Sequence, residues 1–192
     1  MFLGKQNPEL EKFADILIKS TVGLFAERGE IEFSKKEKTK RKIIEYNGRM
    51  RADGMERFKN EPTYVSVVNY FANATDMARQ KALGAVVVYV QQEYLVPLMK
   101  LLKYPPIDDE SESALLDSCG TLANIIAGRY KSDIVSAGYI ELEMSHFSNY
   151  RNTSFDGVAF CFNEFSLYEI SFEIEHRKRI VLDMSMGVVP RR

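Results

Sequence analysis

Hydrophobic positions recur with helical spacing near the start of the chain and in its middle, and with strand spacing between and after these regions. Behind the Asn7-Pro8 dipeptide, an apolar stripe extends to Gly29 and predicts a core-facing helix. A second helical run reaches about Lys131, and Asp109 with Glu112 is spaced like a capping box at its start. The chain is therefore expected to hold two long helices that lie far apart in sequence.

The remaining apolar runs are typical of strands. Two β-rich runs are joined by a connection at 73–84, and a short helix with Pro97 near its first turn is expected at 93–104. The run 139–147 alternates strictly between apolar and polar residues, which indicates an antiparallel strand with one wet face. The expected strands are 64–71, 84–90, 139–147, 158–165, 167–175 and 179–187. This order predicts one α/β domain, of the α+β kind, with a largely antiparallel sheet.

Residues 30–62 differ sharply in composition from their surroundings. Six basic residues lie between Lys35 and Lys42, and such a run is compatible with a patch that binds nucleic acid or an anionic ligand. The alternative is a solvated hairpin or loop, which is favoured because few aromatic residues are interleaved for base stacking and acidic residues are close by. We therefore treat residues 1–192 as a single domain with a charged insertion at about 30–62, and nucleic acid is not the expected partner.

The amino-acid composition does not indicate a particular class of partner. The formal net charge is −1, so the overall charge does not call for nucleic acid or a membrane. Cys119 and Cys161 lie in apolar runs without CxxC spacing. This pattern is typical of small core residues in a reducing compartment. His146 and His176 have no ligand-spaced partners, so no metal site is expected. No apolar run suggests a signal peptide or a membrane span, and the expected location is cytoplasmic.

The middle helix carries a polar stripe, which we define as Asp117, Thr121, Asn124 and Gly128. At roughly 100° per residue, these four positions fall within a narrow sector opposite the apolar face. All four residue types have mediocre or poor helix propensity, and the stripe is small and nearly uncharged. Such a surface lets another backbone or a small group approach closely. The alternative is a local role, with Asp117 and Asn124 bonding nearby backbone and Gly128 near the helix end.

The segment 117–128, DSCGTLANIIAG, resembles the signature helix of the CheC/CheX/FliY chemotaxis phosphatases. Their pattern is Asp or Ser, three residues, Glu, two residues, Asn. In CheX-type members this Asn is often followed by two hydrophobic residues, then Ala and Gly, as it is in the segment Asn124–Gly128. The order of elements agrees over about Asn7–Gly29 and Tyr64–Gly187. The resemblance implies a CheX-like fold with two long helices on one face of the sheet. It also implies a homodimer formed through sheet edges, for which 167–175 is a candidate.

The resemblance further implies that the chain acts on a phosphorylated CheY-like response regulator. Such proteins hydrolyse the regulator's aspartyl phosphate and have no cofactor of their own, since Mg²⁺ is carried by the partner regulator. Asn124 is the catalytic residue that the motif indicates, with an amide that holds the attacking water in line with phosphorus. Asp117, Thr121 and Gly128 are the expected partner-binding residues.

Thr121 departs from the family pattern, because it stands where the signature has a Glu that pairs with a lysine of the regulator. Loss of one side of a desolvated interfacial charge pair commonly costs about 2–5 kcal/mol. Asp117, one turn earlier, is a possible substitute of different reach. Two functions stay open: a weak or selective response-regulator phosphatase, or a non-catalytic interaction module of the same fold that binds a response regulator or a motor or signalling protein.

Overall fold

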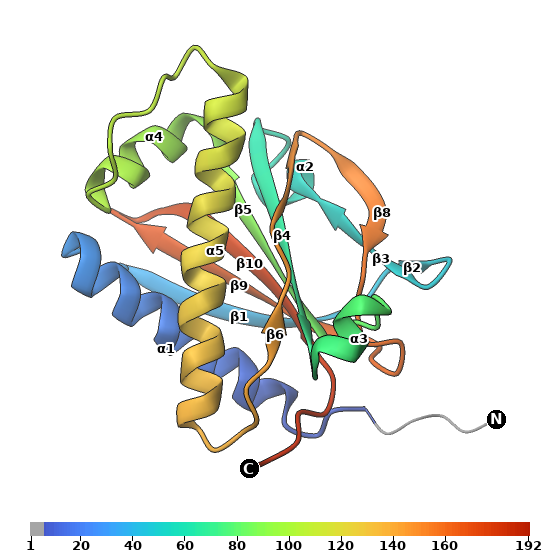
Figure 1. Cartoon of the computed structure of the whole chain (residues 1–192). Coiled ribbons are helices and arrows are strands. Elements are labelled where there is room, and N and C mark those ends of the chain that lie inside the picture. Colours follow the sequence, from blue (N-terminus) through green and yellow to red (C-terminus); the bar gives the residue numbers. More distant parts are fainter. Residues whose placement is uncertain (1–5) are drawn as a thin grey trace.

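The computed structural model describes residues 6–192 and is built around one antiparallel sheet (Figure 1). The strand order is β1-β9-β10-β5-β4-β6, with β7 also paired to β4. The strands are β1 (Lys35–Lys42), β4 (Thr63–Phe71), β5 (Gly84–Gln91), β6 (Glu143–Met144), β7 (Ser148–Arg151), β9 (Ser166–Ile174) and β10 (Arg177–Met186). All of these neighbouring strands pair antiparallel, which confirms the predicted sheet.

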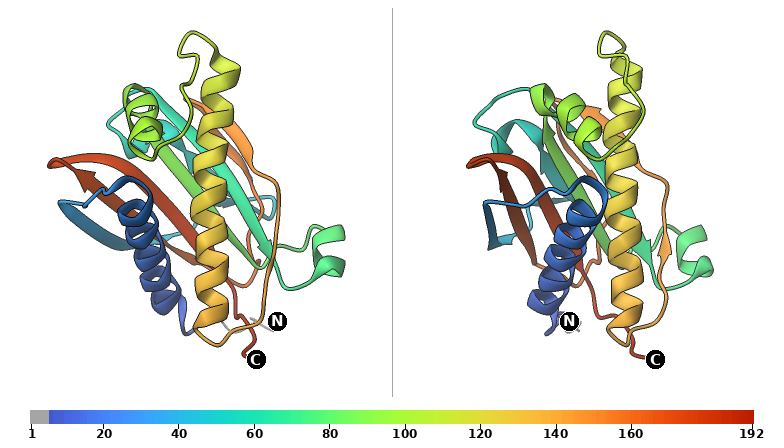
Figure 2. Two further views of the ribbon diagram at one scale, coloured as in Figure 1. Left: turned by 60° about the vertical axis from the view of Figure 1, so that its left-hand side comes forward. Right: turned by 90° about the vertical axis from the view of Figure 1, so that its left-hand side faces the viewer.

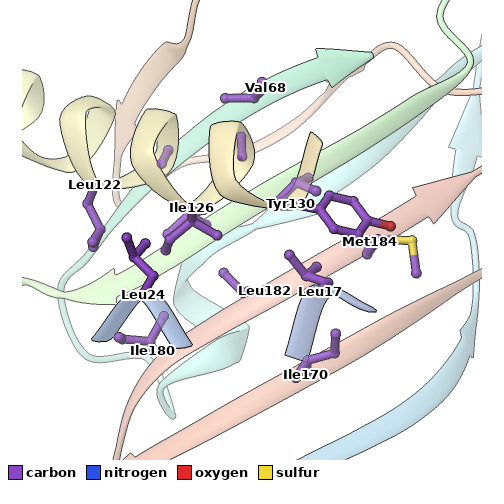
Figure 3. Close-up of a cluster of buried hydrophobic side chains, with 14 of the residues drawn as sticks. Leu17, Leu24, Val68, Leu122, Ile126, Tyr130, Ile170, Ile180, Leu182 and Met184 are labelled. Carbon is purple, nitrogen blue, oxygen red and sulfur yellow. The ribbon is translucent and has the colours of Figure 1, made fainter. Parts of the chain in front are cut away.

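Two long helices, α1 (Leu10–Gly29) and α5 (Glu112–Ser136), pack on one face of this sheet together with α4 (Gln92–Leu101) (Figure 2). Figure 3 shows Leu17 and Leu24 of α1 meeting Leu122 and Ile126 of α5 above the strands. The sheet contributes Val68, Ile170, Ile180, Leu182 and Met184 to the same core. Removal of this apolar surface from water is the main stabilising term. The predicted arrangement of helices and sheet is confirmed.

The opposite face of the sheet is also covered. A small sheet, in the order β2-β3-β8, lies over it together with the short helix α2. These elements are β2 (Glu45–Tyr46), β3 (Arg49–Asp53), α2 (Gly54–Arg57) and β8 (Ser154–Val158); a further short helix, α3 (Ala74–Ala78), joins β4 to β5. Met50 and Phe58 pack with Val87 and Tyr89 of β5 in a second core. Strands β4 and β5 are therefore buried on both faces, which explains their continuous apolar runs.

The lysine run is solvated, as the favoured interpretation expected, but it is neither a hairpin nor a loop: it forms strand β1, which pairs with a strand far away in the sequence. It pairs with β9 along its whole length, from Lys35 opposite Glu173 to Lys42 opposite Ser166. Seven of its eight positions are exposed and one is half-buried. Apolar periodicity could not reveal this strand, because an exposed edge strand is held by backbone hydrogen bonds and needs no apolar face.

The same pairing corrects the expectation that 167–175 is an uncovered sheet edge. Strand β9 lies between β1 and β10, so both of its edges are occupied. The homodimer stays a prediction, but β9 is not the strand through which two copies could pair. Within residues 6–192, no helix is both long enough and apolar enough to span a bilayer.

Two expected strands are mostly irregular in the structure. Within 139–147 only Glu143–Met144 forms a strand, although Leu142 is buried between the exposed Glu141 and Glu143 as the alternation requires. In the expected strand 158–165, residues 159–165 form no strand. Alternating burial does not demand a ladder here, because a segment that crosses the end of a sheet can also place every second side chain inward.

The helix ends also differ from expectation. Ser111 caps α5, with its Oγ accepting a hydrogen bond from the Ala114 N–H at 3.2 Å, so the pair Asp109 and Glu112 is not the cap. Helix α5 continues to Ser136, five residues beyond the expected end at Lys131. Helix α4 begins at Gln92, which places Pro97 in its second turn and not near its first.

A buried ion pair attaches the second layer to the main sheet. Arg57 of α2 donates from Nη2 to Asp183 Oδ2 of β10 at 2.6 Å, and the Tyr89 hydroxyl donates to the same oxygen at 2.9 Å. The Arg57 Nε also lies 3.3 Å from Glu169 Oε2. Burial raises the pKa of the Asp183 carboxyl, and the charge of Arg57 offsets part of that rise. The carboxylate therefore depends on Arg57 for its compensation.

Replacing Arg57 by Met leaves the Asp183 carboxyl buried without its cation. We expect Arg57→Met to lower the free energy of unfolding at neutral pH by about 3–5 kcal/mol, measured by urea denaturation. Because burial holds the folded-state pKa of Asp183 above its unfolded value, the loss is smallest at acid pH, where both states carry the proton. It grows as the pH rises above about 4, the ordinary pKa of an aspartate.

The matched control is the double variant Arg57→Met/Asp183→Asn, which removes both charges and keeps an acceptor for Tyr89. It should recover most of the lost stability and lose the pH dependence. If the effects of the two substitutions simply add, the ion pair is not what attaches this layer.

Candidate functional site

Helix α5 lies across the sheet with neighbours on both flanks, and none of the elements described in residues 6–192 covers its outer face (Figures 1 and 2). On one flank Arg129 donates to Glu27 of α1 at 2.8 Å. On the other flank Gly120 faces Phe147 and Asn149, in the segment that enters β7. The helix is thus held at both sides, and its solvent-facing side stays open to a partner.

The polar stripe occupies this open side. Asp117 and Asn124 are exposed, while Thr121 and Gly128 are half-buried. At Gly128 an added Cβ would find no heavy atom within 4 Å, so the surface there is open space. The structure therefore brings all four residues together on one uncovered face, as their spacing indicated.

Hydrogen bonding separates the members of the stripe. The Thr121 hydroxyl donates back to the Asp117 carbonyl at 2.9 Å and so lies against its own helix. Ser132, one turn beyond Gly128, does the same to the Gly128 carbonyl at 3.2 Å. The Asn124 amide, in contrast, makes no side-chain hydrogen bond to residues 6–192. Its N–H₂ and C=O are both free to bind a molecule from outside.

Apart from Asp117, which belongs to the stripe, the charged side chains of α5 nearest to Asn124 are paired with neighbouring residues. Arg129, the nearest cation along the helix, is held by Glu27 and by Asp133, whose Oδ2 lies 3.3 Å from the Arg129 Nε. These hydrogen bonds raise the pKa of Arg129. Between Asp117 and Lys131 no charged side chain lies on the outer face. An amide in such surroundings can approach an anionic group without a net charge of its own.

The described residues contain no candidate metal centre. Within 6–192 no cluster of three or more His, Cys, Asp or Glu residues could hold an ion. Cys119 lies in the core directly beneath the stripe, and burial raises the pKa of its thiol to about 12, so it is an inert core residue as expected. Cys161 is half-buried, and burial raises the pKa of its thiol as well. The chemistry of this surface therefore rests on Asn124.

Gly120 is a residue of the site that the sequence interpretation overlooked. It is buried, and an added Cβ would overlap the Phe147 ring and lie 2.9 Å from Asn149 Nδ2. The close approach lets the segment before β7 flank the helix. Helical spacing offered no signal for this role, because Gly120 lies one turn before Asn124 and therefore close to the polar stripe.

No protein-family model matches the sequence, and no curated protein is significantly similar to it. Solved structures do match its fold. A CheC-like superfamily protein from Shewanella sp. PV-4 superposes with a TM-score of 0.62 at 12% identity, covering 92% of this chain and 97% of that one. The chemotaxis protein CheX from Desulfovibrio desulfuricans gives 0.60 at 13% identity, with 92% and 99% covered. A chain of the CheX–CheY–BeF3–Mg²⁺ complex from Borrelia burgdorferi gives 0.52 at 8% identity, with 92% and 98% covered.

These matches define the class of fold to which the chain belongs. It has the fold of the CheC-like and CheX chemotaxis proteins over 92% of its length. The CheX-like fold that the sequence predicted is thereby confirmed. At these identities the likeness concerns the fold, and the role of each residue in the polar stripe is argued from the site itself.

The two glycines of α5 provide a matched test of the packing around the stripe. Gly128→Ala should raise the free energy of unfolding by about 0.5–1 kcal/mol, because alanine favours helix and meets open space. Gly120→Ala should lower it by about 1–3 kcal/mol, because the new methyl displaces Phe147. Thermal and urea denaturation of both variants measure the difference. Equal effects at the two positions would show that β7 does not pack on α5 as described.

Proposed function

We propose that this chain is a CheX-like protein that docks the outer face of α5 on a phosphorylated CheY-like response regulator and promotes hydrolysis of its aspartyl phosphate. The observation that carries the proposal is the exposed, unbonded amide of Asn124 in the middle of a helix face of small side chains, on which Asp117 carries the charge. Support also comes from the fold, which is shared with a CheX found in complex with CheY.

The proposed chemistry needs only positioning from this chain. The regulator brings the aspartyl phosphate and its Mg²⁺, and the chain requires no cofactor of its own. The Asn124 amide binds a water and holds it in line with phosphorus. The water oxygen forms the new P–O bond while the bond to the aspartyl oxygen breaks. Inorganic phosphate and a free aspartate carboxylate are the products.

The other members of the stripe fit a docking role. Gly128 presents no side chain, so a regulator's backbone can approach the helix one turn beyond Asn124. Asp117 is exposed one turn before Thr121 and supplies the carboxylate on this face for a lysine of the regulator. Its shorter side chain and different angle give it a different reach from a Glu at position 121. A weak or selective interaction follows from that difference.

Thr121 supports the second candidate function, a non-catalytic module that binds a response regulator or a motor or signalling protein. Its hydroxyl is bonded to the Asp117 carbonyl and carries no charge, so it cannot form a salt bridge with a partner lysine. Such a module would still use the open face of α5. The two functions differ in whether Asn124 changes the lifetime of the regulator's phosphate.

Asn124→Ala tests the catalytic function. It should lower phosphate release from a phosphorylated CheY-like regulator by about a hundredfold, because the water loses its positioning group. The free energy of unfolding should change by less than about 0.5 kcal/mol, since the side chain is exposed and unbonded. Phosphate release across a panel of phosphorylated regulators and urea denaturation provide the two readouts. Ser136→Ala, at the far end of the same helix, is the control that should leave both unchanged.

The contrary outcome is that Asn124→Ala and the original chain give the same phosphate lifetime with every regulator that the chain binds or dephosphorylates. The function would then be that of the interaction module. Unfolding by the same substitution would mean that Asn124 is architectural and would remove the basis of both.

Thr121→Glu tests the docking interface. The new carboxylate lies on the exposed face, beside the position where a regulator lysine would dock. We expect it to raise affinity for a CheY-like regulator by about tenfold or more, the equivalent of about 1.4 kcal/mol. Fluorescence titration of a labelled regulator, at two ionic strengths, measures the gain. Thr121→Gln has the same length without the charge and is the matched control. Equal affinity of the Glu and Gln variants would argue against a lysine at this point of the interface.

A further inference from the structure

Strand β1 ends the main sheet, and its outer edge is free (Figure 1). The Ile43 N–H, directly after the strand, donates to the Phe165 carbonyl at 2.8 Å on the β9 side. Peptide groups of an antiparallel pair alternate in direction with a period of two residues. The odd-numbered residues of β1 therefore turn their N–H and C=O groups towards β9. The even-numbered residues Lys36, Lys38, Lys40 and Lys42 turn theirs outward, where none of the described strands pairs with them.

The outward-facing peptide groups all belong to lysines, and most of these lysines are not neutralised. Lys38 lies 2.9 Å from Glu11 Oε1 and 2.6 Å from Asp15 Oδ1 of α1. Lys36, Lys40 and Lys42 form no ion pair with residues 6–192. The edge thus combines a row of unsatisfied backbone donors and acceptors with a row of positive charge on one face of the sheet.

A small, mostly apolar pocket lies at the end of this edge, and Glu45 and Glu164 are part of its lining. Its volume is about 140 Å³, and Ile43 and Phe160 are buried in its wall. Phe162 and Phe165, which also line it, are 70% and 47% exposed. Lys42 is part of the same pocket. Exposed aromatic side chains around a pocket commonly mark the anchor of a protein interface.

The charge of the edge decides which occupant fits. A second copy of β1 would place lysines opposite lysines, which is destabilising in a sheet. Nucleic acid would satisfy the lysines but would use neither the peptide groups nor the apolar pocket. An extended acidic polypeptide satisfies all three features, because its carboxylates face the lysines while its backbone completes the ladder.

We propose that β1 receives an extended acidic segment of a partner protein as an additional antiparallel strand. In that orientation the added strand starts near Lys42 and runs towards Lys35, so its first residue lies at the pocket. The segment then carries an apolar residue at its start, over Phe162 and Phe165, followed by acidic residues at every second position. Those acidic residues lie opposite Lys42, Lys40, Lys38 and Lys36, and their own N–H groups point at β1.

The probe is a ten-residue peptide of sequence FETETETETE, labelled at its carboxyl end and titrated by fluorescence polarisation. A version N-methylated at its glutamates should lose binding, because those N–H groups form the ladder. The version N-methylated at its threonines should retain it. The protein variants Lys40→Thr and Lys40→Pro remove the same charge, but only proline also removes the outward N–H, and it spares the bonds to β9. Lys40→Pro should bind the peptide about tenfold more weakly than Lys40→Thr.

Hydrogen exchange of the intact protein gives an independent readout. Addition of the peptide should slow exchange at the amides of Lys36, Lys38, Lys40 and Lys42, which does not depend on any variant folding. Phe162→Ser should weaken binding of the peptide with phenylalanine at its start but not of the same peptide without it.

Three results would overturn the proposal. The first is no binding of the peptide at millimolar concentration, which would leave the lysines as protection against edge pairing. The second is equal loss with both N-methylated peptides. The third is tighter, steeply salt-dependent binding of a twenty-nucleotide oligothymidylate without amide protection, which would assign the edge to nucleic acid.

Discussion

The architecture depends on the central strands β4 and β5, because their side chains are apolar on both faces and neither face can be left to water. The helices α1, α4 and α5 cover one face, and the layer built from residues 43–58 and β8 covers the other. Each cover has its own consequence. On the helix side, α5 must lie flat on the sheet, which turns its opposite side to solvent, where none of residues 6–192 covers it. On the other side, the covering layer is attached through a second apolar core and through the ion pair of Arg57 with Asp183.

The two layers that cover the sheet are stabilised by different interactions. The helix layer rests on interlocking aliphatic and aromatic side chains, with Leu17, Leu122 and Ile126 fully buried. The second layer is smaller and holds a charged group at its centre, where Asp183 is 1% exposed. A buried carboxylate is expensive unless it is paired. The guanidinium of Arg57 therefore compensates the charge of Asp183 at the centre of this layer.

Two kinds of element could be predicted from sequence. Some have one apolar and one polar face, and others are apolar on both faces. The apolar stripes of α1 and α5 and the runs of β4, β5 and β10 belong to these two kinds. Strand β1 does not, because its eight residues are held by the ladder to β9 and carry no apolar signal. The cap at Ser111 was missed because Asp109 and Glu112 have the spacing of a capping box, whereas Ser111 caps the helix without a Glu or Gln three residues later.

The site was partly visible for the same reason. A helical period placed Asp117, Thr121, Asn124 and Gly128 in one sector, and the structure leaves that sector uncovered. Spacing could not show that the Thr121 hydroxyl bonds back to its own helix while the Asn124 amide stays free, since both have the same periodicity. Spacing also could not show that Gly120 packs against another segment while Gly128, on the same helix, faces open space. That difference depends on Phe147, which the fold brings from a distant segment.

The open face of α5 and the free edge of β1 are separate surfaces of one sheet-based body. Helix α5 is flanked by α1 and by the segment leading into β7, next to β4, whereas β1 lies at the opposite end of the strand order. They share no residue, and α1 stands between them, with Asp15 bound to Lys38 on one side and Glu27 bound to Arg129 on the other. A regulator on α5 and an acidic strand on β1 would therefore not compete for the same contacts. The two proposed partners would therefore occupy separate surfaces, one the polar stripe of α5 and the other the positively charged edge of β1.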